Sequence, residues 1–350
     1  MLDLTPILAC YPALDRPGPP PAVHPLPGGL INTTYRVGDD HVLQRLHPIF
    51  HADVNLDIAA LVPHLLAAGV AVPGIVAARD GRPFVVAAAP LDGVWRLLTR
   101  LPGHTLHAVP SAAVARSVAE LCGRFHGALR GVPHRFAFTR PGAHDTDLHR
   151  TRLRDALSHH PDHRLHATVA ALAAALERAW AQWGALPSLP ARIVHGDLKV
   201  SNLLFDDEGG ASAVLDLDTM AWGTLDVELG DALRSWCNPG REDDPAPRFD
   251  VGVAIAALDG YVRAAASWLT AAELAALPAA AEHIALELSM RFAADALNDN
   301  YFGWDPTRFA SRSEHNLVRA CNQWGLAQSA AAARPELTAA AAALLVGLRG

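Results

Sequence analysis

The sequence predicts an α+β fold in two parts, a small antiparallel β-sheet over residues 1–101 and a larger, mostly helical part over residues 102–350. Two observations support this prediction. Short β-prone runs separated by Gly and Asp turns occupy the first hundred residues. Ala-rich segments with apolar residues three and four positions apart dominate the remainder, as expected of helices with one buried face.

The first strand pair is expected over residues 31–46. The β-prone run INTTYRV leads into a Gly-Asp-Asp turn at 38–40, and VLQRL at 42–46 follows it. A glycine pair, Gly28 and Gly29, precedes the first run, and glycine backbone at such a place can lie over phosphate groups. An ordinary hairpin with a glycine turn is the alternative for this stretch taken alone.

Residues 53–68 are expected to form a helix, and residues 74–100 two further strands around the turn at 79–82. The last strand runs into a Pro-Gly break at 102–103, so we expect the two parts of the chain to join there.

Helices are expected over 111–130, 167–183 and 225–236, and over most of 250–349. The His-rich segment 159–166 contains a proline and has no accompanying Cys or carboxylate pattern, so it is expected to be a solvated loop and a helix start.

The stretch from 194 to 231 carries the chemistry. Its pattern predicts a strand end, a tight loop, a short apolar strand, a turn at 206–210 and a returning strand at 213–217. Such a hairpin brings Asn202 and Asp216 close together and leaves Asp197 on the loop beside them.

These three residues match the needs of phosphoryl transfer of the protein-kinase type. That reaction uses a carboxylate at the attacking hydroxyl, an amide on one Mg²⁺ and a carboxylate on the metals. Asp197 is therefore predicted to be the base, with Asn202 and Asp216 as Mg²⁺ ligands. Lys199 stands where a kinase loop has a phosphate-facing lysine. The alternative is that the HGD segment at 195–197 is an ordinary turn and the LDLD segment at 215–218 is a half-buried strand with solvated acids.

The motif HGDxxxxN at 195–202 resembles that of the aminoglycoside phosphotransferase superfamily. The resemblance implies a bilobal protein-kinase-like fold, with ATP and Mg²⁺ as cofactors. It also implies that His195 and Asp231 support the catalytic loop without touching the reactants, Asp231 by hydrogen bonding to it.

Within that superfamily the chain most resembles the N-acetylhexosamine 1-kinases. The shared segments are INTTYRV at 31–37, LQR at 43–45, PHRF at 133–136, DLDT at 216–219, RFAAD at 291–295 and EHNLVR at 314–319. This implies transfer of phosphate to a sugar hydroxyl, the anomeric hydroxyl of GlcNAc or GalNAc, with Asp197, Arg291, Asp295 and Tyr301 around the acceptor. Another sugar, an amino alcohol or an aminoglycoside is the alternative acceptor, and a kinase-fold protein that binds nucleotide without turnover is the alternative class.

The nucleotide is expected to lie against the sheet and the join between the two parts. Gln44 and Arg45 stand where a protein kinase has its strand lysine, and only one of two adjacent strand residues can face the site. Asp57 is the weak candidate for a helix acid that would pair with such a cation. The full set of expected nucleotide contacts is Gly28, Gly29, Asn32, Thr33, Gln44, Arg45, Thr99, Arg100, Leu101 and Lys199.

Composition restricts the class of protein. The chain has 350 residues, 51% of them hydrophobic, and a formal net charge of −7, which argues against a nucleic-acid or anionic-membrane surface. Its four cysteines are far apart, and prolines break its longest apolar stretch. We therefore expect a cytoplasmic protein with a small-molecule substrate, no nucleic-acid partner and no membrane span. The sequence assigns no oligomeric state.

Overall fold

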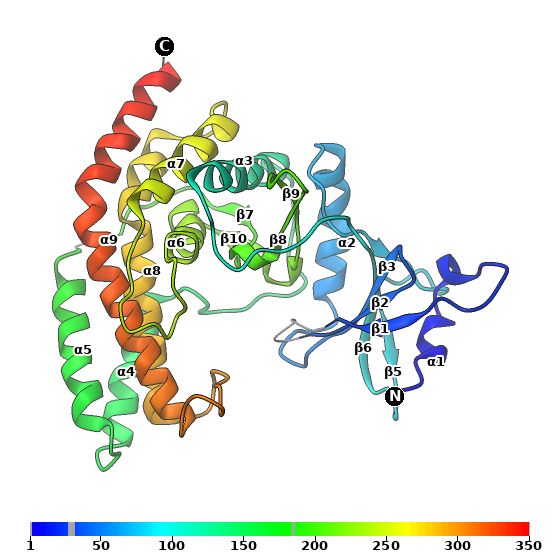
Figure 1. Ribbon diagram of the computed structural model, residues 1–350, viewed down its shortest axis with the longest axis horizontal. Helices are drawn as coiled ribbons and strands as arrows, with labels where there is room; N and C mark the ends of the chain where they lie inside the picture. The colour runs from blue at the N-terminus through cyan, green and yellow to red at the C-terminus, as the bar shows by residue number, and fades with distance from the viewer. Residues whose placement is uncertain (1, 27–31, 184–185, 350) are drawn as a thin grey trace.

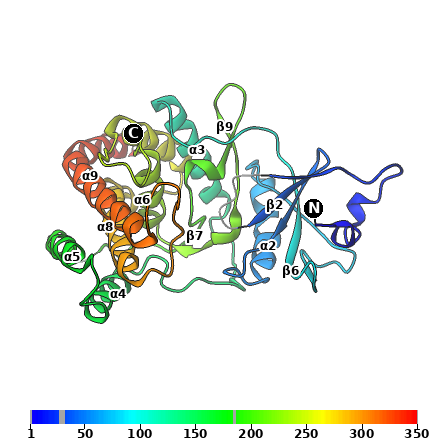
Figure 2. The ribbon, with the colours of Figure 1, turned by 60° about the horizontal axis from the view of Figure 1, so that its bottom comes forward.

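The computed structural model describes residues 2–26, 32–183 and 186–349. The expected phosphate-loop residues Gly28 and Gly29 lie outside the described residues. The predicted α+β, protein-kinase-like fold is confirmed: an antiparallel sheet forms the N-terminal part and a mostly helical part follows, as Figures 1 and 2 show.

The N-terminal part is a sheet with one helix on each face. Its strands pair antiparallel in the order β1-β2-β3-β6-β4, and β5 also pairs with β6. The elements are α1 (Thr5–Leu8), a short 3-10 turn (Pro12–Leu14), β1 (Val23–Pro25), β2 (Thr33–Val37), β3 (His41–Arg45), α2 (Val54–Ala67), β4 (Ile75–Val76), β5 (Val85–Ala87) and β6 (Gly93–Thr99).

Alternation along the strands divides the sheet into an apolar face and a polar face. Leu43, Trp95 and Leu97 are fully buried in a cluster with Tyr11, whose hydroxyl donates to the Trp95 carbonyl at 3.1 Å. Neighbouring residues point the opposite way, because side chains alternate along a strand. On that opposite face Arg96 meets α2, which lies between the sheet and the helical part in Figure 1.

The C-terminal part contains seven helices among the described residues and two small strand pairs, β7 with β10 and β8 with β9. Its elements are α3 (Ala112–Ala128), α4 (Thr146–His159), α5 (His166–Ala181), β7 (Arg192–Val194), η2 (Val200–Asn202), β8 (Leu203–Phe205), β9 (Ala211–Val214), η3 (Leu217–Thr219), β10 (Ala221–Gly223), α6 (Leu225–Trp236), α7 (Val251–Ala265), α8 (Ala271–Asn298) and α9 (Arg312–Arg349).

Helix α8 is the central helix of this part. It begins with a capping box, in which Thr270 and Glu273 satisfy each other's backbone N–H groups. Buried residues occur on all its sides, as expected of a helix surrounded by protein, and α9 lies alongside it in both views. In the part of the chain that the structure describes, every helix is too short or too polar to cross a membrane.

The two parts join through a backbone contact at Gly103. This glycine has φ +114°, and a Cβ atom there would lie 2.7 Å from the Phe205 carbonyl oxygen, so only glycine fits without displacement. His104 and Phe205 then exchange backbone hydrogen bonds of 3.0 and 2.8 Å. The segment that leaves the sheet is thereby attached to β8, the strand that follows the catalytic loop.

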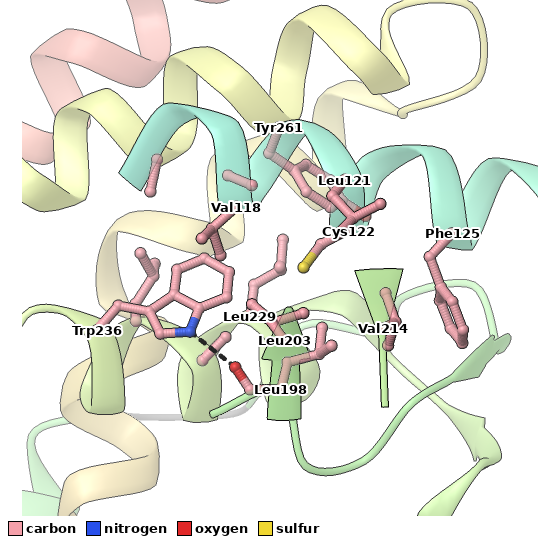
Figure 3. Close-up of a cluster of buried hydrophobic side chains, with 14 of the residues drawn as sticks. Val118, Leu121, Cys122, Phe125, Leu198, Leu203, Val214, Leu229, Trp236 and Tyr261 are labelled. Atoms are coloured by element: carbon pink, nitrogen blue, oxygen red, sulfur yellow. Dashed lines mark hydrogen bonds between the residues drawn. The ribbon is translucent and has the colours of Figure 1, made fainter. Parts of the chain in front are cut away.

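A buried apolar cluster supports that loop from behind. Figure 3 shows Leu198 and Leu203 packed below α3 and next to Leu229 and Trp236, which belong to α6. The Trp236 indole Nε1 donates to the Leu198 carbonyl at 2.7 Å, which satisfies a polar group inside the cluster. Because interiors are close-packed, this contact limits movement of the loop backbone next to Asp197.

Candidate active site

The loop between β7 and β8 brings its polar side chains together. Asp197 Oδ2 accepts from Lys199 Nζ at 2.5 Å and from Asn202 Nδ2 at 3.0 Å. Burial favours the neutral amine, but the charges of Asp197 and then Asp216 outweigh it and raise the pKa of Lys199. Lys199 is therefore a cation beside the predicted base.

Glu228 in the first turn of α6 holds the loop backbone. Its carboxylate accepts from the His195 N–H at 2.8 Å and from the Gly196 N–H at 2.9 Å, and His126 Nε2 lies 3.2 Å away. Burial alone would raise the pKa of Glu228, but the hydrogen bond and charge of His126 lower it, followed by His195. Glu228 is thus ionised at neutral pH.

This corrects the role expected of Asp231. The described hydrogen bonds of its carboxylate go to Arg234 Nε at 2.9 Å, and the loop is braced instead by Glu228, one helical turn earlier. Both acids occur on α6 at an i, i+3 spacing, so they share a helix face and the sequence alone did not separate them.

His195 links the loop to the LDLD segment at 215–218. Its buried ring bonds the Leu215 carbonyl through Nε2 at 2.7 Å and accepts from the Asp197 N–H through Nδ1 at 3.2 Å. Leu215 also donates its N–H to the Asn202 carbonyl at 2.8 Å. The expected meeting of Asn202, Asp216 and Asp197 therefore has a definite backbone framework.

Asp216 follows β9 in a left-handed conformation, with φ +58° and ψ +59°. Its side chain is exposed, yet the surrounding chain removes part of its solvation, and this together with the charges of Asp218 and Asp197 raises its pKa. A cation bound there would relieve that repulsion.

The donor set fits Mg²⁺ bound together with a nucleotide. Asn202 turns its amide nitrogen to Asp197, so its oxygen and the Asp216 carboxylate are left as hard ligands. No group of three or more His, Cys, Asp or Glu within 2–26, 32–183 and 186–349 could hold a metal by itself. Mg²⁺ commonly uses one or two carboxylates plus substrate phosphates and water, so the two ligands suffice.

On the sheet side, Gln44 and not Arg45 faces this site. Arg45 Nη2 bonds Asp92 at 2.9 Å on the other side of the strand, whereas Gln44 Oε1 accepts from Arg96 Nε and Nη2 at 2.9 and 2.7 Å. The Arg96 guanidinium in turn bonds both oxygens of Asp218. Arg96 was not predicted as a site residue, although a lone arginine inside an apolar strand is a signal of a buried polar role.

Asn32 directly precedes β2, and Thr33 is the first residue of that strand. Asn32 Nδ2 donates to Asp218 Oδ2 at 2.9 Å, and Asn32 Oδ1 accepts from the His47 N–H at 2.9 Å, while Thr33 is exposed at the start of β2. Asn32 is therefore tied to the acidic segment of the helical part.

The structure places Asp57 away from the cation of the sheet. Its carboxylate accepts from His134 Nε2 at 2.9 Å and from the backbone N–H groups of Ala137 and Phe138 at 2.8 and 3.0 Å. The α2 residue that reaches Arg96 is Asn55, with Oδ1 3.3 Å from Nη1. The expected pairing of Asp57 with a sheet cation is wrong, because its two oxygens serve the 134–138 segment.

At the end of β6 the backbone is partly committed. The Thr99 N–H donates to the Gly74 carbonyl at 2.9 Å, and the Arg100 N–H to the Asp40 carbonyl at 2.7 Å. Of the three residues expected to contact the nucleotide here, Thr99, Arg100 and Leu101, Leu101 is the one whose N–H has no hydrogen bond to the described residues.

A cavity of about 370 Å³ opens beside the catalytic loop. The segment 138–145 forms one wall, and Gly196 with residues 219–231 forms the other. Gly196 has φ +80°, and a Cβ atom there would lie 2.5 Å from the Thr219 carbonyl oxygen, so glycine lets the loop pass close to this wall. A cavity of this size suits a small ligand.

An acidic and a basic side chain, Asp231 and His144, line this cavity. Burial would raise the pKa of Asp231, but Arg234 and then His144 lower it, so the carboxylate is ionised. Burial opposes protonation of His144, yet its 3.0 Å contact with Glu287 raises its pKa. Thr146 donates to the other Glu287 oxygen at 2.7 Å and fixes that carboxylate.

None of the predicted acceptor residues on α8 and beyond lines this cavity. Arg291 is half-buried, lies over the Phe302 ring at 5.7 Å, and is close enough to help lower the pKa of Asp231. Asp295 uses both oxygens on the Asn300, Tyr301 and Phe302 N–H groups and on Asn316. This geometry favours a structural role for Asp295.

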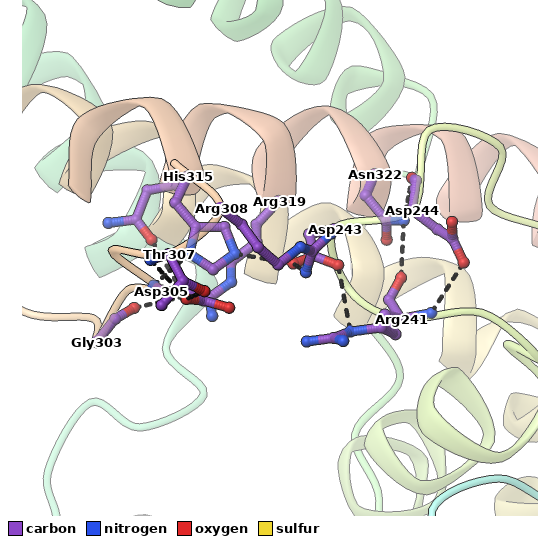
Figure 4. A network of polar contacts seen from close by, with 11 residues as sticks. Arg241, Asp243, Asp244, Gly303, Asp305, Thr307, Arg308, His315, Arg319 and Asn322 are labelled. Carbon is purple, nitrogen blue, oxygen red and sulfur yellow. Dashed lines mark hydrogen bonds and ion pairs between the residues drawn. The ribbon is translucent and has the colours of Figure 1, made fainter. Parts of the chain in front are cut away.

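Tyr301 is 54% exposed, and its hydroxyl lies 3.5 Å from Arg140 Nη2. The loop that carries it is attached to α9 and to residues 241–244 by the polar network in Figure 4. There Asp243 Oδ2 accepts from Arg308 at 2.5 Å and from His315 Nε2 at 3.1 Å, and Arg319 donates to the Gly303 carbonyl at 2.7 Å.

Comparison with known proteins agrees with this geometry. A model of the phosphotransferase enzyme family (APH) matches residues 22–274. A homoserine kinase of Nitrobacter hamburgensis is 31% identical in an alignment of 245 residues that covers 68% of this chain and 67% of that protein. A homoserine kinase of Xanthobacter autotrophicus is 28% identical in an alignment of 295 residues that covers 80% of this chain and 84% of that protein.

Solved structures with the same fold include an amicoumacin kinase in complex with AMP-PNP and Ca²⁺. It has a TM-score of 0.62 at 15% identity, covering 93% of this chain and 92% of that one. A microcompartment-associated aminopropanol kinase has a TM-score of 0.57 at 18% identity, covering 90% and 93%. The matched family model and the homoserine kinase of Nitrobacter hamburgensis show that this chain belongs to the phosphotransferase enzyme family, as a small-molecule kinase with a protein-kinase-like fold.

Proposed function

We propose that this kinase transfers the γ-phosphate of ATP to the hydroxyl group of a small amino acid of the homoserine class, which carries both an ammonium and a carboxylate group. The observation that carries the proposal is the cavity beside the catalytic loop, which presents an ionised carboxylate, Asp231, and a histidine with a raised pKa, His144. An ammonium group would pair with the first and a carboxylate with the second.

The loop residues then have distinct tasks. Asp197 accepts the proton of the acceptor hydroxyl, and its contact with Asn202 fixes the carboxylate orientation. Lys199 offers a cation to the transferred phosphoryl group. Mg²⁺, held by Asn202 and Asp216, would neutralise phosphate charge when bound.

An N-acetylhexosamine is the second candidate acceptor. It is favoured by the sequence segments shared with the N-acetylhexosamine 1-kinases and by Arg291, which is close enough to influence Asp231 and His144 and could donate to an acetamido oxygen. Against it, Asp295 is fully hydrogen-bonded within the chain and Tyr301 is largely exposed. The sugar would therefore lack two of its expected contacts.

An ATP-consumption screen tests the proposal. Homoserine, aminopropanol, choline, GlcNAc, GalNAc, galactose and an aminoglycoside are supplied in turn, and ³¹P NMR identifies the phosphorylated position. We expect turnover of homoserine above that of aminopropanol, which lacks the carboxylate. Turnover of sugars alone would replace the proposal by the sugar kinase, and nucleotide binding without any turnover would favour the binding protein.

Variants of the cavity sharpen the result. Asp231→Asn should raise the KM of an ammonium-bearing acceptor about tenfold or more, because a charge-assisted hydrogen bond is lost. His144→Gln should raise the KM of homoserine much more than that of aminopropanol. Asp147→Asn is the matched control, since this α4 acid pairs with Arg150 and its side chain is 87% exposed.

A further inference from the structure

A buried arginine of the sheet, Arg96, is completely engaged by three side chains, those of Gln44, Asn55 and Asp218. The residue is 2% exposed. Its Nε and Nη2 donate to Gln44 Oε1 at 2.9 and 2.7 Å, and Nη1 donates to Asn55 Oδ1 at 3.3 Å. Both Nη atoms also donate to the Asp218 carboxylate. All five N–H groups of the guanidinium thus have an acceptor, and the fork has none left for a nucleotide.

The position of Arg96 follows from strand pairing. Its Cα is the direct partner of the Gln44 Cα across β3 and β6. Protein kinases place a lysine on the third strand and pair it with a helix glutamate. Here both corresponding elements carry neutral amides, Gln44 and Asn55, and the cation comes from the adjacent strand. The two amide oxygens orient the guanidinium and leave its charge for Asp218.

Asp218 is as fully constrained as its partner. It is 1% exposed, and its Oδ2 accepts from Asn32 as well as from Arg96, at 2.9 Å each. It lies in the middle of the three-residue turn Leu217–Thr219, which starts directly after Asp216. Asp216 has a positive φ of 58°, a conformation that persists in a residue other than glycine only when its surroundings impose it.

We propose that Arg96 is the positioning residue of the metal site: by holding Asp218 from the sheet, it fixes the 217–219 turn and thereby orients the Asp216 carboxylate for the divalent cation. The inference rests on the kinase function proposed above, but not on the identity of the acceptor. It also explains why the chain retains two acids in LDLD, one exposed for the metal and one buried for the arginine.

Nucleotide binding at varied Mg²⁺ concentration tests this directly. The affinity for AMP-PNP is measured by calorimetry in EDTA and over a Mg²⁺ series, so no acceptor and no turnover are needed. Arg96→Met should raise the half-saturating Mg²⁺ concentration roughly 10- to 100-fold, the usual effect of removing a group that orients a metal ligand. The affinity in EDTA should stay unchanged. Arg96→Lys, which keeps the charge without the fork, should fall between.

Two further variants separate positioning from stability. Arg82→Met is the matched control, because Arg82 pairs with Asp80 in the exposed turn between β4 and β5, with Nε 2.7 Å from Oδ2. Arg96→Met/Asp218→Asn removes both buried charges, so it should unfold at a higher temperature than Arg96→Met alone. Its half-saturating Mg²⁺ concentration should nevertheless remain raised, because the guanidinium that holds the turn from the sheet is absent.

Three results would overturn the proposal. Equal loss of affinity with and without Mg²⁺ would make Arg96 a direct phosphate contact. An unchanged Mg²⁺ dependence in a folded Arg96→Met would leave it a purely structural ion pair. Recovery of the wild-type Mg²⁺ dependence in the double variant would attribute the defect to the unpaired Asp218 charge. A failed acceptor screen would affect none of these measurements, so the two proposals can fail separately.

Discussion

Replacement of Glu228 by glutamine should weaken both the fold and the catalytic loop. The carboxylate accepts two backbone N–H groups, from His195 and Gly196, and hydrogen bonds to a charged group contribute about 1.5–3 kcal/mol each. In Glu228→Gln one oxygen becomes an NH₂ group that faces a donor, and the remaining bond is a neutral one of about 0.5–1.5 kcal/mol. The free energy of unfolding should therefore fall by about 2–5 kcal/mol.

Urea unfolding at neutral pH measures this change, and steady-state kinetics should show kcat reduced by about 10²-fold, because a loop misplaced by an ångström loses that much. Asp226→Asn is the matched control on the same turn of α6. Among the described residues Asp226 Oδ1 has no hydrogen-bond partner, so Asp226→Asn should change the free energy of unfolding very little. An unfolding free energy within about 0.5 kcal/mol of wild type for Glu228→Gln would refute the bracing role.

The lowered pKa of Glu228 predicts that the free energy of unfolding falls at acid pH. Its pKa is lowered in the folded protein, so its contribution is present above the ordinary value of 4.5 and is lost as the pH falls through the lower, folded-state value. Glu228→Gln should have a flatter stability profile over this range. An unchanged acid slope would show that Glu228 does not titrate with unfolding.

Three further predictions concern the reaction and the join between the two parts. Asp197→Asn should reduce turnover by about 10²-fold or more while calorimetry still detects ATP binding; full activity would exclude this base. Asp216→Ala should abolish Mg²⁺-dependent nucleotide binding, and Asn202→Ala should weaken it less; equal binding by the first would remove its metal role. Gly103→Ala should lower the unfolding free energy by roughly 1–3 kcal/mol, because its Cβ would meet the Phe205 carbonyl; an unaltered melting temperature would contradict this.

The parts of the site that were predictable are those encoded within one short stretch. Asp197, Asn202 and Asp216 are close in sequence, and a loop followed by a hairpin brings them together by local geometry alone. Arg96 could not be found in this way, because its role depends on the register that pairs it with Gln44, 52 residues earlier, and on Asp218 in the other part of the chain.

Two other differences have the same kind of cause. Glu228 and Asp231 are both plausible partners of the loop from their spacing, and only the direction in which α6 meets the loop distinguishes them. Asp295 is of a residue type that often contacts ligands, but its oxygens accept backbone hydrogen bonds in the turn after α8. Which backbone N–H groups need a side-chain acceptor cannot be read from a sequence pattern until the path of the chain is known.

Helix α2 joins two regions that the sequence keeps far apart. Asn55 contacts the guanidinium that holds Asp218, and Asp57, two residues later, holds the segment 134–138 that continues into the wall of the cavity proposed to bind the acceptor. A shift of this helix on nucleotide binding must therefore displace that wall as well. Linkage then requires reciprocity: the factor by which bound nucleotide changes the affinity for the acceptor equals the factor by which bound acceptor changes the affinity for the nucleotide.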